Sequence, residues 1–93
     1  MREYELILVI HPDLDENAFQ EVLKRVTGWV TESGGELIKT DIWGKRELAY
    51  RIKKQKQGQY ALLQVKMAPT FCAQLDHNLR FLEPVMRFLL TAR

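Results

Sequence analysis

The sequence predicts an α+β fold in which a four-stranded antiparallel sheet carries two helices on one face. Four segments alternate apolar and polar residues with a period of two, as strands do, and two segments repeat apolar residues at helical spacing. Their order is strand, helix, strand, strand, helix, strand. Two right-handed crossovers in that order place both helices on the same face, which is the ferredoxin-like βαββαβ sandwich. A length of 93 residues fits a single domain over residues 1–93.

The first strand is predicted over Arg2–Ile10, because alternate residues there form one wholly apolar face, and a His-Pro-Asp step ends it. A helix follows, and Asp15, or Asp13 together with Glu16, can cap it by accepting hydrogen bonds from the amides of its first turn. Gly34-Gly35 ends this helix, since glycine accepts the left-handed conformation. Its apolar stripe consists of Phe19, Val22, Leu23, Val26, Trp29 and Val30.

The two middle strands are predicted to form a hairpin. Residues 36–52 are extended, and Gly44 in their middle predicts a bulge or bend, with Trp43 beside it partly exposed. A polar turn covers residues 53–58. In the strand that follows, the side chains expected to face the core are those of Ala61, Leu63, Val65 and Met67.

The second helix is predicted to begin near Pro69, which suits a first helical turn, and to end before Pro84. Its apolar stripe consists of Phe71, Leu75, Leu79 and Leu82. The last strand covers residues 85–91. In this strand we expect Met86, Phe88 and Leu90 to face the core, and Val85, Arg87, Leu89 and Thr91 to face outward.

Charge is distributed unevenly along the chain. Residues 1–44 hold four cations and nine acids, whereas residues 45–93 hold ten cations and three acids. Such polarity favours a polyanionic partner. A lysine-rich turn is also typical of a solvated hairpin tip, but the planar fork of arginine matches phosphate. Residues 44–60 alone concentrate six cations against one acid: Lys45, Arg46, Arg51, Lys53, Lys54 and Lys56 against Glu47.

The sheet face without helices is predicted to be more apolar than a surface that meets only water. The parity of the strands places a set of large side chains there, which favours a protein partner on this face. We expect this set to be more exposed than core residues such as Leu8, Leu63 and Phe88. The set is Ile7, Val9, Tyr60, Leu62 and Leu89, beside Arg87.

The sequence contains no strong pattern that is typical of an enzyme or a metal site. Neither His11 nor His77 has a cysteine or a second histidine at ligand spacing, so both are expected on the surface. The spacing of Cys72 from the second helical stripe favours packing over reactivity. An acylphosphatase-like enzyme would need a glycine-flanked arginine cradle after the first strand, where His-Pro-Asp stands. We expect no enzyme activity, no cofactor, no metal and no small-molecule substrate.

The expected compartment is cytoplasmic. The longest apolar run, Leu6–Ile10, is far shorter than the roughly 20 residues that cross a bilayer, so no membrane span is predicted. Acids among the first residues argue against a secretion signal. A single cysteine fits a reducing environment.

An RNA-recognition motif shares this order of elements and is the natural comparison. Its third strand carries aromatic, small and aromatic residues directly after a glycine. Here Gly58 is followed by Gln59-Tyr60-Ala61-Leu62, which places the one aromatic residue out of register. Stacking of bases across the sheet is therefore disfavoured. Tyr4, Tyr50 and Tyr60 could still act as stacking platforms, although packing in the core or across strands is the better explanation for each of them.

The segment from Gly44 to Lys54, with Leu48-Ala49-Tyr50 at its centre, resembles the hallmark of the bacterial small-subunit ribosomal protein six family. Gly58-Gln59-Tyr60, which opens the next strand, fits the same family, as do Arg2-Glu3-Tyr4-Glu5 and Pro12-Asp13-Leu14. The resemblance covers residues 2–91. Arg51 departs from the pattern, because proline is common at that position.

The resemblance implies a non-catalytic structural constituent of the small ribosomal subunit that acts in translation. It would bind 16S-type ribosomal RNA in the central domain, as a heterodimer with ribosomal protein eighteen, in a bacterial or organellar ribosome. The alternative is a ferredoxin-like regulatory module that homodimerises through its sheet. Arg2 and Arg87 are expected to lie near each other on adjacent strands. The predicted RNA contacts are Arg2, Lys45, Arg46, Lys53, Lys54 and Arg87.

Overall fold

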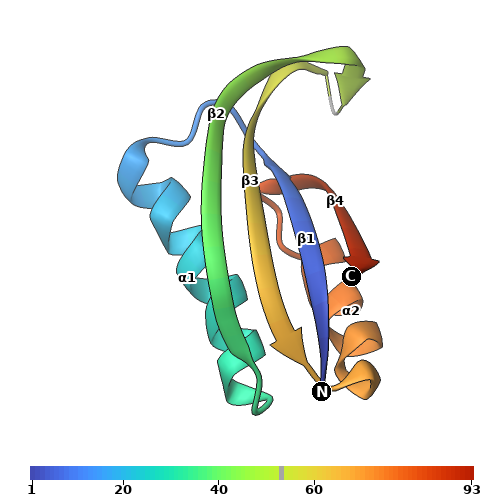
Figure 1. Cartoon of the computed structure of the whole chain (residues 1–93). Helices are drawn as coiled ribbons and strands as arrows, with labels where there is room; N and C mark the ends of the chain where they lie inside the picture. The colour runs from blue at the N-terminus through green and yellow to red at the C-terminus, as the bar shows by residue number, and fades with distance from the viewer. Residues whose placement is uncertain (53) are drawn as a thin grey trace.

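The computed structural model describes residues 1–52 and 54–93 as one antiparallel sheet with helices packed on one face (Figure 1). The strands lie in the spatial order β2-β3-β1-β4, which confirms the predicted ferredoxin-like arrangement. The elements are β1 (Arg2–Ile10), α1 (Glu16–Glu32), β2 (Glu36–Ile52), β3 (Gln55–Met67), the short 3₁₀ helix η1 (Pro69–Phe71), α2 (Cys72–Arg80) and β4 (Val85–Ala92).

A single hydrophobic core lies between the sheet and both helices. The two central strands, β1 and β3, contribute alternate residues to it, because successive side chains of a strand point to opposite faces. Helix α1 contributes its predicted stripe. The second predicted stripe is shared by η1 (Phe71), α2 (Leu75 and Leu79) and the turn after α2 (Leu82), because this helix ends earlier than predicted. Fully buried members of this core are Leu6, Leu8, Leu63, Val65, Leu75 and Leu79.

The ends of α1 follow the sequence prediction. The Oδ1 atom of Asp15 accepts a hydrogen bond from the backbone N–H of Ala18 at 2.8 Å, which confirms Asp15 as the cap. At the other end Gly34 adopts a φ of 93°, and the N–H of Gly35 donates to the carbonyl oxygen of Val30 at 3.0 Å. The carbonyl of Lys66 lies so close to Gly35 that a side chain there would clash. The glycine pair therefore both ends the helix and lets β2 approach β3.

The hairpin between β2 and β3 is longer than predicted. Strand β3 begins at Gln55, so most of the segment expected as a turn is extended. Lys54 takes the left-handed conformation, with a φ of 67°, at the turn itself. The predicted bulge is confirmed, because the pairing register shifts between Ile42 and Gly44, and Gly44 has a φ of 83°.

A second irregularity changes which residues of β4 face the core. Ile10 pairs with Val85 and Val9 pairs with Arg87, so Met86 is an extra residue in the ladder. Val85 joins the core cluster, and the prediction that it faces outward was wrong. Met86, which was expected to face the core, is instead buried on the opposite face, close to Val9, so this prediction was wrong as well. A bulge reverses the alternation of a strand, and the sequence pattern alone gave no sign of it.

Candidate nucleic-acid interface

The predicted basic residues of β2 divide between the two faces of the sheet. Lys45 pairs with Gln59 and Arg46 pairs with Gly58, and adjacent strand residues point to opposite sides. The side chain of Gln59 reaches the loop between β1 and α1, so Lys45 shares the helix side. Arg46 instead lies on the helix-free face, where its guanidinium carbon is 6.0 Å from the centre of the Trp43 ring.

Four cations gather around a hollow of about 340 Å³ at the end of the hairpin. Lys45 and Arg51 come from β2, Lys54 from the turn and Lys56 from β3, and we call this site the basic hollow. The only acid among the lining residues is Asp13. A concave surface with this excess of positive charge attracts phosphate groups.

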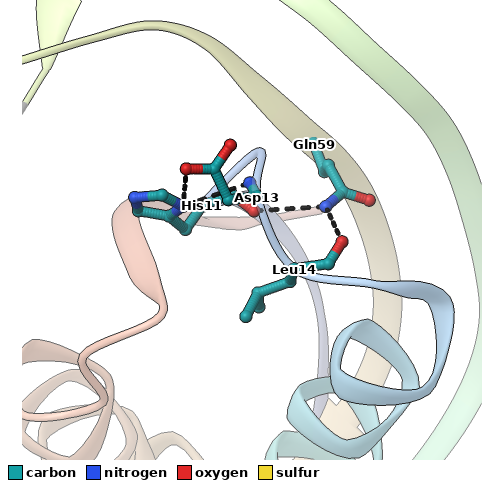
Figure 2. Close-up of polar contacts among 4 residues, drawn as sticks. All are labelled: His11, Asp13, Leu14 and Gln59. Atoms are coloured by element: carbon teal, nitrogen blue, oxygen red, sulfur yellow. Dashed lines mark hydrogen bonds and ion pairs between the residues drawn. The ribbon is translucent and has the colours of Figure 1, made fainter.

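The opposite wall of the basic hollow is the loop between β1 and α1, which polar contacts hold in place (Figure 2). The Nε2 atom of Gln59 donates to the carbonyl oxygens of His11 and Leu14, each at 3.1 Å. The backbone N–H of Asp13 donates to Nδ1 of His11 at 3.1 Å. These bonds tie the loop to β3, so the basic hollow has one preorganised wall.

The sequence prediction of RNA contacts matches the basic hollow only in part. Lys45 and Lys54 line it, but Arg51 and Lys56 line it as well and were not selected. Arg51 lies six residues after Lys45, and residues an even number of positions apart on a strand share a face. This spacing could have identified Arg51 as a neighbour of Lys45 in the same site. Lys53, also predicted as a contact, lies outside the described residues.

Arg2 and Arg87 do not lie near each other, so that prediction was wrong. Arg2 pairs with Met67 at one end of the sheet, whereas Arg87 pairs with Val9 at the other. Arg2 and Val9 are seven residues apart on one strand, which corresponds to about 23 Å at ~3.3 Å per residue. Strands β1 and β4 are indeed neighbours, but their antiparallel direction separates the two arginines.

The tyrosines predicted as possible stacking platforms have different environments. Tyr4 is buried in the core, which excludes it as a platform. Tyr60 is half-buried and stacks on Trp43, with ring centres 6.1 Å apart and an interplanar angle of 12°. Tyr50 is 60% exposed, and its hydroxyl accepts a hydrogen bond from Nη1 of Arg87. Trp43 is partly exposed, as predicted.

The helix-free face is less open than predicted, because the end of the hairpin bends over it (Figure 1). Ile7, Tyr60 and Leu62 are half-buried and Leu89 is 57% exposed, but Val9 is buried, so the expectation for Val9 was wrong. Side chains of the hairpin end enclose an apolar hollow of about 310 Å³ above Ile7, Val9 and Leu89. Phe88, expected in the core, packs against the core cluster as predicted but is only half-buried, because it lies on the edge strand.

No helix in residues 1–52 and 54–93 is long and apolar enough to span a membrane. The same residues contain no cluster of three or more side chains that could bind a metal ion.

The sequence model of the family described as ribosomal protein S6 matches residues 3–92. The chain belongs to the ribosomal protein S6 family. The small ribosomal subunit protein bS6 of Moorella thermoacetica is 36% identical over 91 residues, which cover 98% of this chain and 93% of that protein. The same protein of Heliobacterium modesticaldum is 38% identical over 93 residues, which cover 100% of this chain and 97% of that protein.

A solved structure agrees with this membership in the S6 family. The crystal structure of the 30S ribosomal protein S6 from Thermotoga maritima matches with a TM-score of 0.92 and 26% identity. The match covers 99% of this chain and 87% of that protein. The fold and the family predicted from the sequence are thus confirmed.

The residues that carry the S6 resemblance have structural roles in the hairpin. Leu48-Ala49-Tyr50 forms its bent end, which lines the apolar hollow. Gly58 lies directly beneath this region, where a Cβ atom would be 2.5 Å from Cγ1 of Val9 and 3.2 Å from Cε of Met86. A larger residue at position 58 would push these side chains apart.

Proposed function

We propose that this chain is a structural, non-catalytic component of the small ribosomal subunit that binds small-subunit ribosomal RNA in the central domain together with ribosomal protein eighteen. Membership in the ribosomal protein S6 family supports the assignment to the ribosome. The observation that carries RNA binding is the basic hollow, where Lys45, Arg51, Lys54 and Lys56 surround one concavity. In a bacterial cell the chain would be cytoplasmic and associated with ribosomes.

Each cation of the basic hollow can neutralise one phosphate and release its counterions. The flat stack of Arg46, Trp43 and Tyr60 lies on the other face of the same strands and is a second, weaker candidate for RNA contact. Arg2 lies at the far end of the sheet and would need a separate RNA segment.

The apolar residues of the helix-free face support a protein partner. Leu89 is 57% exposed, and half-buried Ile7, Tyr60 and Leu62 continue the patch beside it. Burial of apolar area contributes about 25 cal/mol per Å², so even part of this patch would stabilise a complex appreciably. The patch lies beside the hairpin, so one small chain can contact a protein and RNA together.

The test is binding of the purified chain to a central-domain ribosomal RNA fragment, with and without ribosomal protein eighteen, over a range of salt concentrations. Four phosphate contacts predict a slope of log K against log salt of about −3.6, or a loss of roughly 150-fold between 50 and 200 mM salt. Retention of RNA only with the partner, with this slope, is the expected result. A chain that forms a salt-insensitive homodimer and retains no RNA under either condition would contradict the proposal and favour a regulatory module.

A further inference from the structure

Residues Leu48–Arg51, here called the arm, lie outside the regular pairing of the hairpin. Glu47 pairs with Gln57, and the next pair is Ile52 with Gln55. The arm therefore places four residues opposite the single residue Lys56. Backbone pairing normally fixes the position of a strand, so the arm needs another contact to hold it.

That contact comes from the opposite edge of the sheet. Arg87 of β4 donates from Nη1 to the Tyr50 hydroxyl, and its guanidinium carbon lies 5.8 Å from the centre of the Tyr50 ring. The two residues are 37 positions apart in the sequence. Arg87 itself is well placed for this role, because its backbone pairs with buried Val9 of the central strand β1.

Tyr50 and Arg51 are neighbours in extended backbone, so their side chains point to opposite sides. Tyr50 lines the apolar hollow over the helix-free face, whereas Arg51 lines the basic hollow. A contact that fixes Tyr50 therefore also fixes the direction of Arg51. No carboxylate of the described residues lies within ion-pair distance of Arg87, and the phenol is its polar side-chain partner there.

We infer that Arg87 is a positioning residue of the RNA interface: it holds the arm through Tyr50 and so places Arg51 in the basic hollow, and it does not neutralise a phosphate itself. This inference rests on the proposed function. It replaces the expectation from the sequence that Arg87 contacts RNA directly. Without Arg87, the arm still reaches phosphate but must be ordered during binding. That ordering costs conformational entropy, which does not depend on salt.

The two roles of Arg87 predict different salt dependences. We expect Arg87→Ala to weaken RNA binding of the complex with ribosomal protein eighteen by roughly ten- to a hundredfold, the scale of one hydrogen bond to a charged group. The slope against salt should stay at the wild-type value. Arg51→Ala, in contrast, should reduce the slope by about 0.9 because it removes a phosphate contact. A slope that falls by about 0.9 in Arg87→Ala would overturn the inference.

Tyr50→Phe is the matched variant, because it removes only the hydroxyl that accepts from Arg87. It should weaken RNA binding in the same way but by less than Arg87→Ala, because the guanidinium still lies over the ring, and the double variant should bind no more weakly than Arg87→Ala, as expected for two residues that act as a unit. The inference would be overturned if the losses of RNA affinity in the two single variants add in the double variant. It would also be overturned if Tyr50→Phe binds RNA as tightly as the wild type does. Arg25→Ala on α1 controls for the loss of one positive charge outside the basic hollow.

A measurement without RNA keeps the inference testable if the proposed function fails. Backbone ¹⁵N order parameters of the arm in the free chain should fall from about 0.85 toward 0.6 in Arg87→Ala, because both contacts that hold the arm are gone, and should fall less in Tyr50→Phe, which keeps the ring beneath the guanidinium. Unchanged order parameters in both variants would refute the positioning role. Failure of the wild-type complex to bind RNA would refute the proposed function alone.

Discussion

Leu62 and Leu63 are adjacent residues of β3 on opposite faces of the sheet, and they offer a matched pair of substitutions. Leu63 is fully buried in the core, whereas Leu62 is half-buried on the helix-free face between its cross-strand partners Ile7 and Asp41. Leu63→Asp loses about 1.5–3 kcal/mol of apolar burial and adds several kcal/mol for an unpaired buried charge. The total is comparable to the whole stability of a 93-residue chain, about 5–14 kcal/mol.

Leu62→Asp should cost far less. It loses part of the burial of one leucine and places a carboxylate opposite that of Asp41, a repulsion of about 0.2–1 kcal/mol. We expect a loss of about 1–2 kcal/mol in stability. Leu62→Asp should nevertheless abolish association with the protein partner, because it puts a charge in the apolar patch.

Urea unfolding followed by circular dichroism measures the first effect, and analytical ultracentrifugation with ribosomal protein eighteen measures the second. The expected result is an unfolded Leu63→Asp chain and a folded Leu62→Asp chain that no longer associates. Leu62→Ala, which keeps the face neutral, is the control for lost contact area. If Leu62→Asp unfolds as completely as Leu63→Asp, the helix-free face is part of the core and the reasoning is wrong.

Three further substitutions test local features. Gly58→Ala should destabilise the chain by about 1–3 kcal/mol in urea unfolding, because its Cβ would lie 2.5 Å from Val9; a neutral effect would show that Val9 can move aside. Asp15→Ala should cost about 1 kcal/mol through loss of the cap on α1, while Asp15→Asn keeps an acceptor and should cost little; equal losses would argue against capping. Gly44→Ala should lower the stability by about 1–2 kcal/mol, because its φ of 83° disfavours a side chain. A steric clash does not contribute, since the added methyl group would meet open space. Calorimetry of the wild type and the variant checks this.

The sequence predicted the elements and the core because both depend on short-range periodicity. Apolar residues at helical spacing identified the stripe of α1, and Asp15 and Gly34 identified its ends. Alternation identified Leu63 as core, and Gly44 identified a bulge. The order of elements then left few topologies, since right-handed crossovers exclude most others.

The candidate site was predicted less completely, because it depends on contacts between distant segments. The positive charge of residues 44–60 was evident, but which cations share one hollow depended on how the end of the hairpin and the loop at Pro12 and Asp13 come together in space. The burial of Val9 depended on the bend of the hairpin end over the helix-free face. Periodicity along one strand carries no information about a segment that folds over it.

The sequence by itself determined the fold class, the family and the two faces of the central strands β1 and β3, since each is encoded by residue type and spacing within a local window. Only the tertiary structure decided where the arginines lie and what they contact. Antiparallel pairing separated Arg2 from Arg87, and the bend of the arm brought Tyr50 to Arg87 across 37 residues. Such a contact forms only when both segments are already folded, because the entropy of closing so long a loop must first be offset by the core.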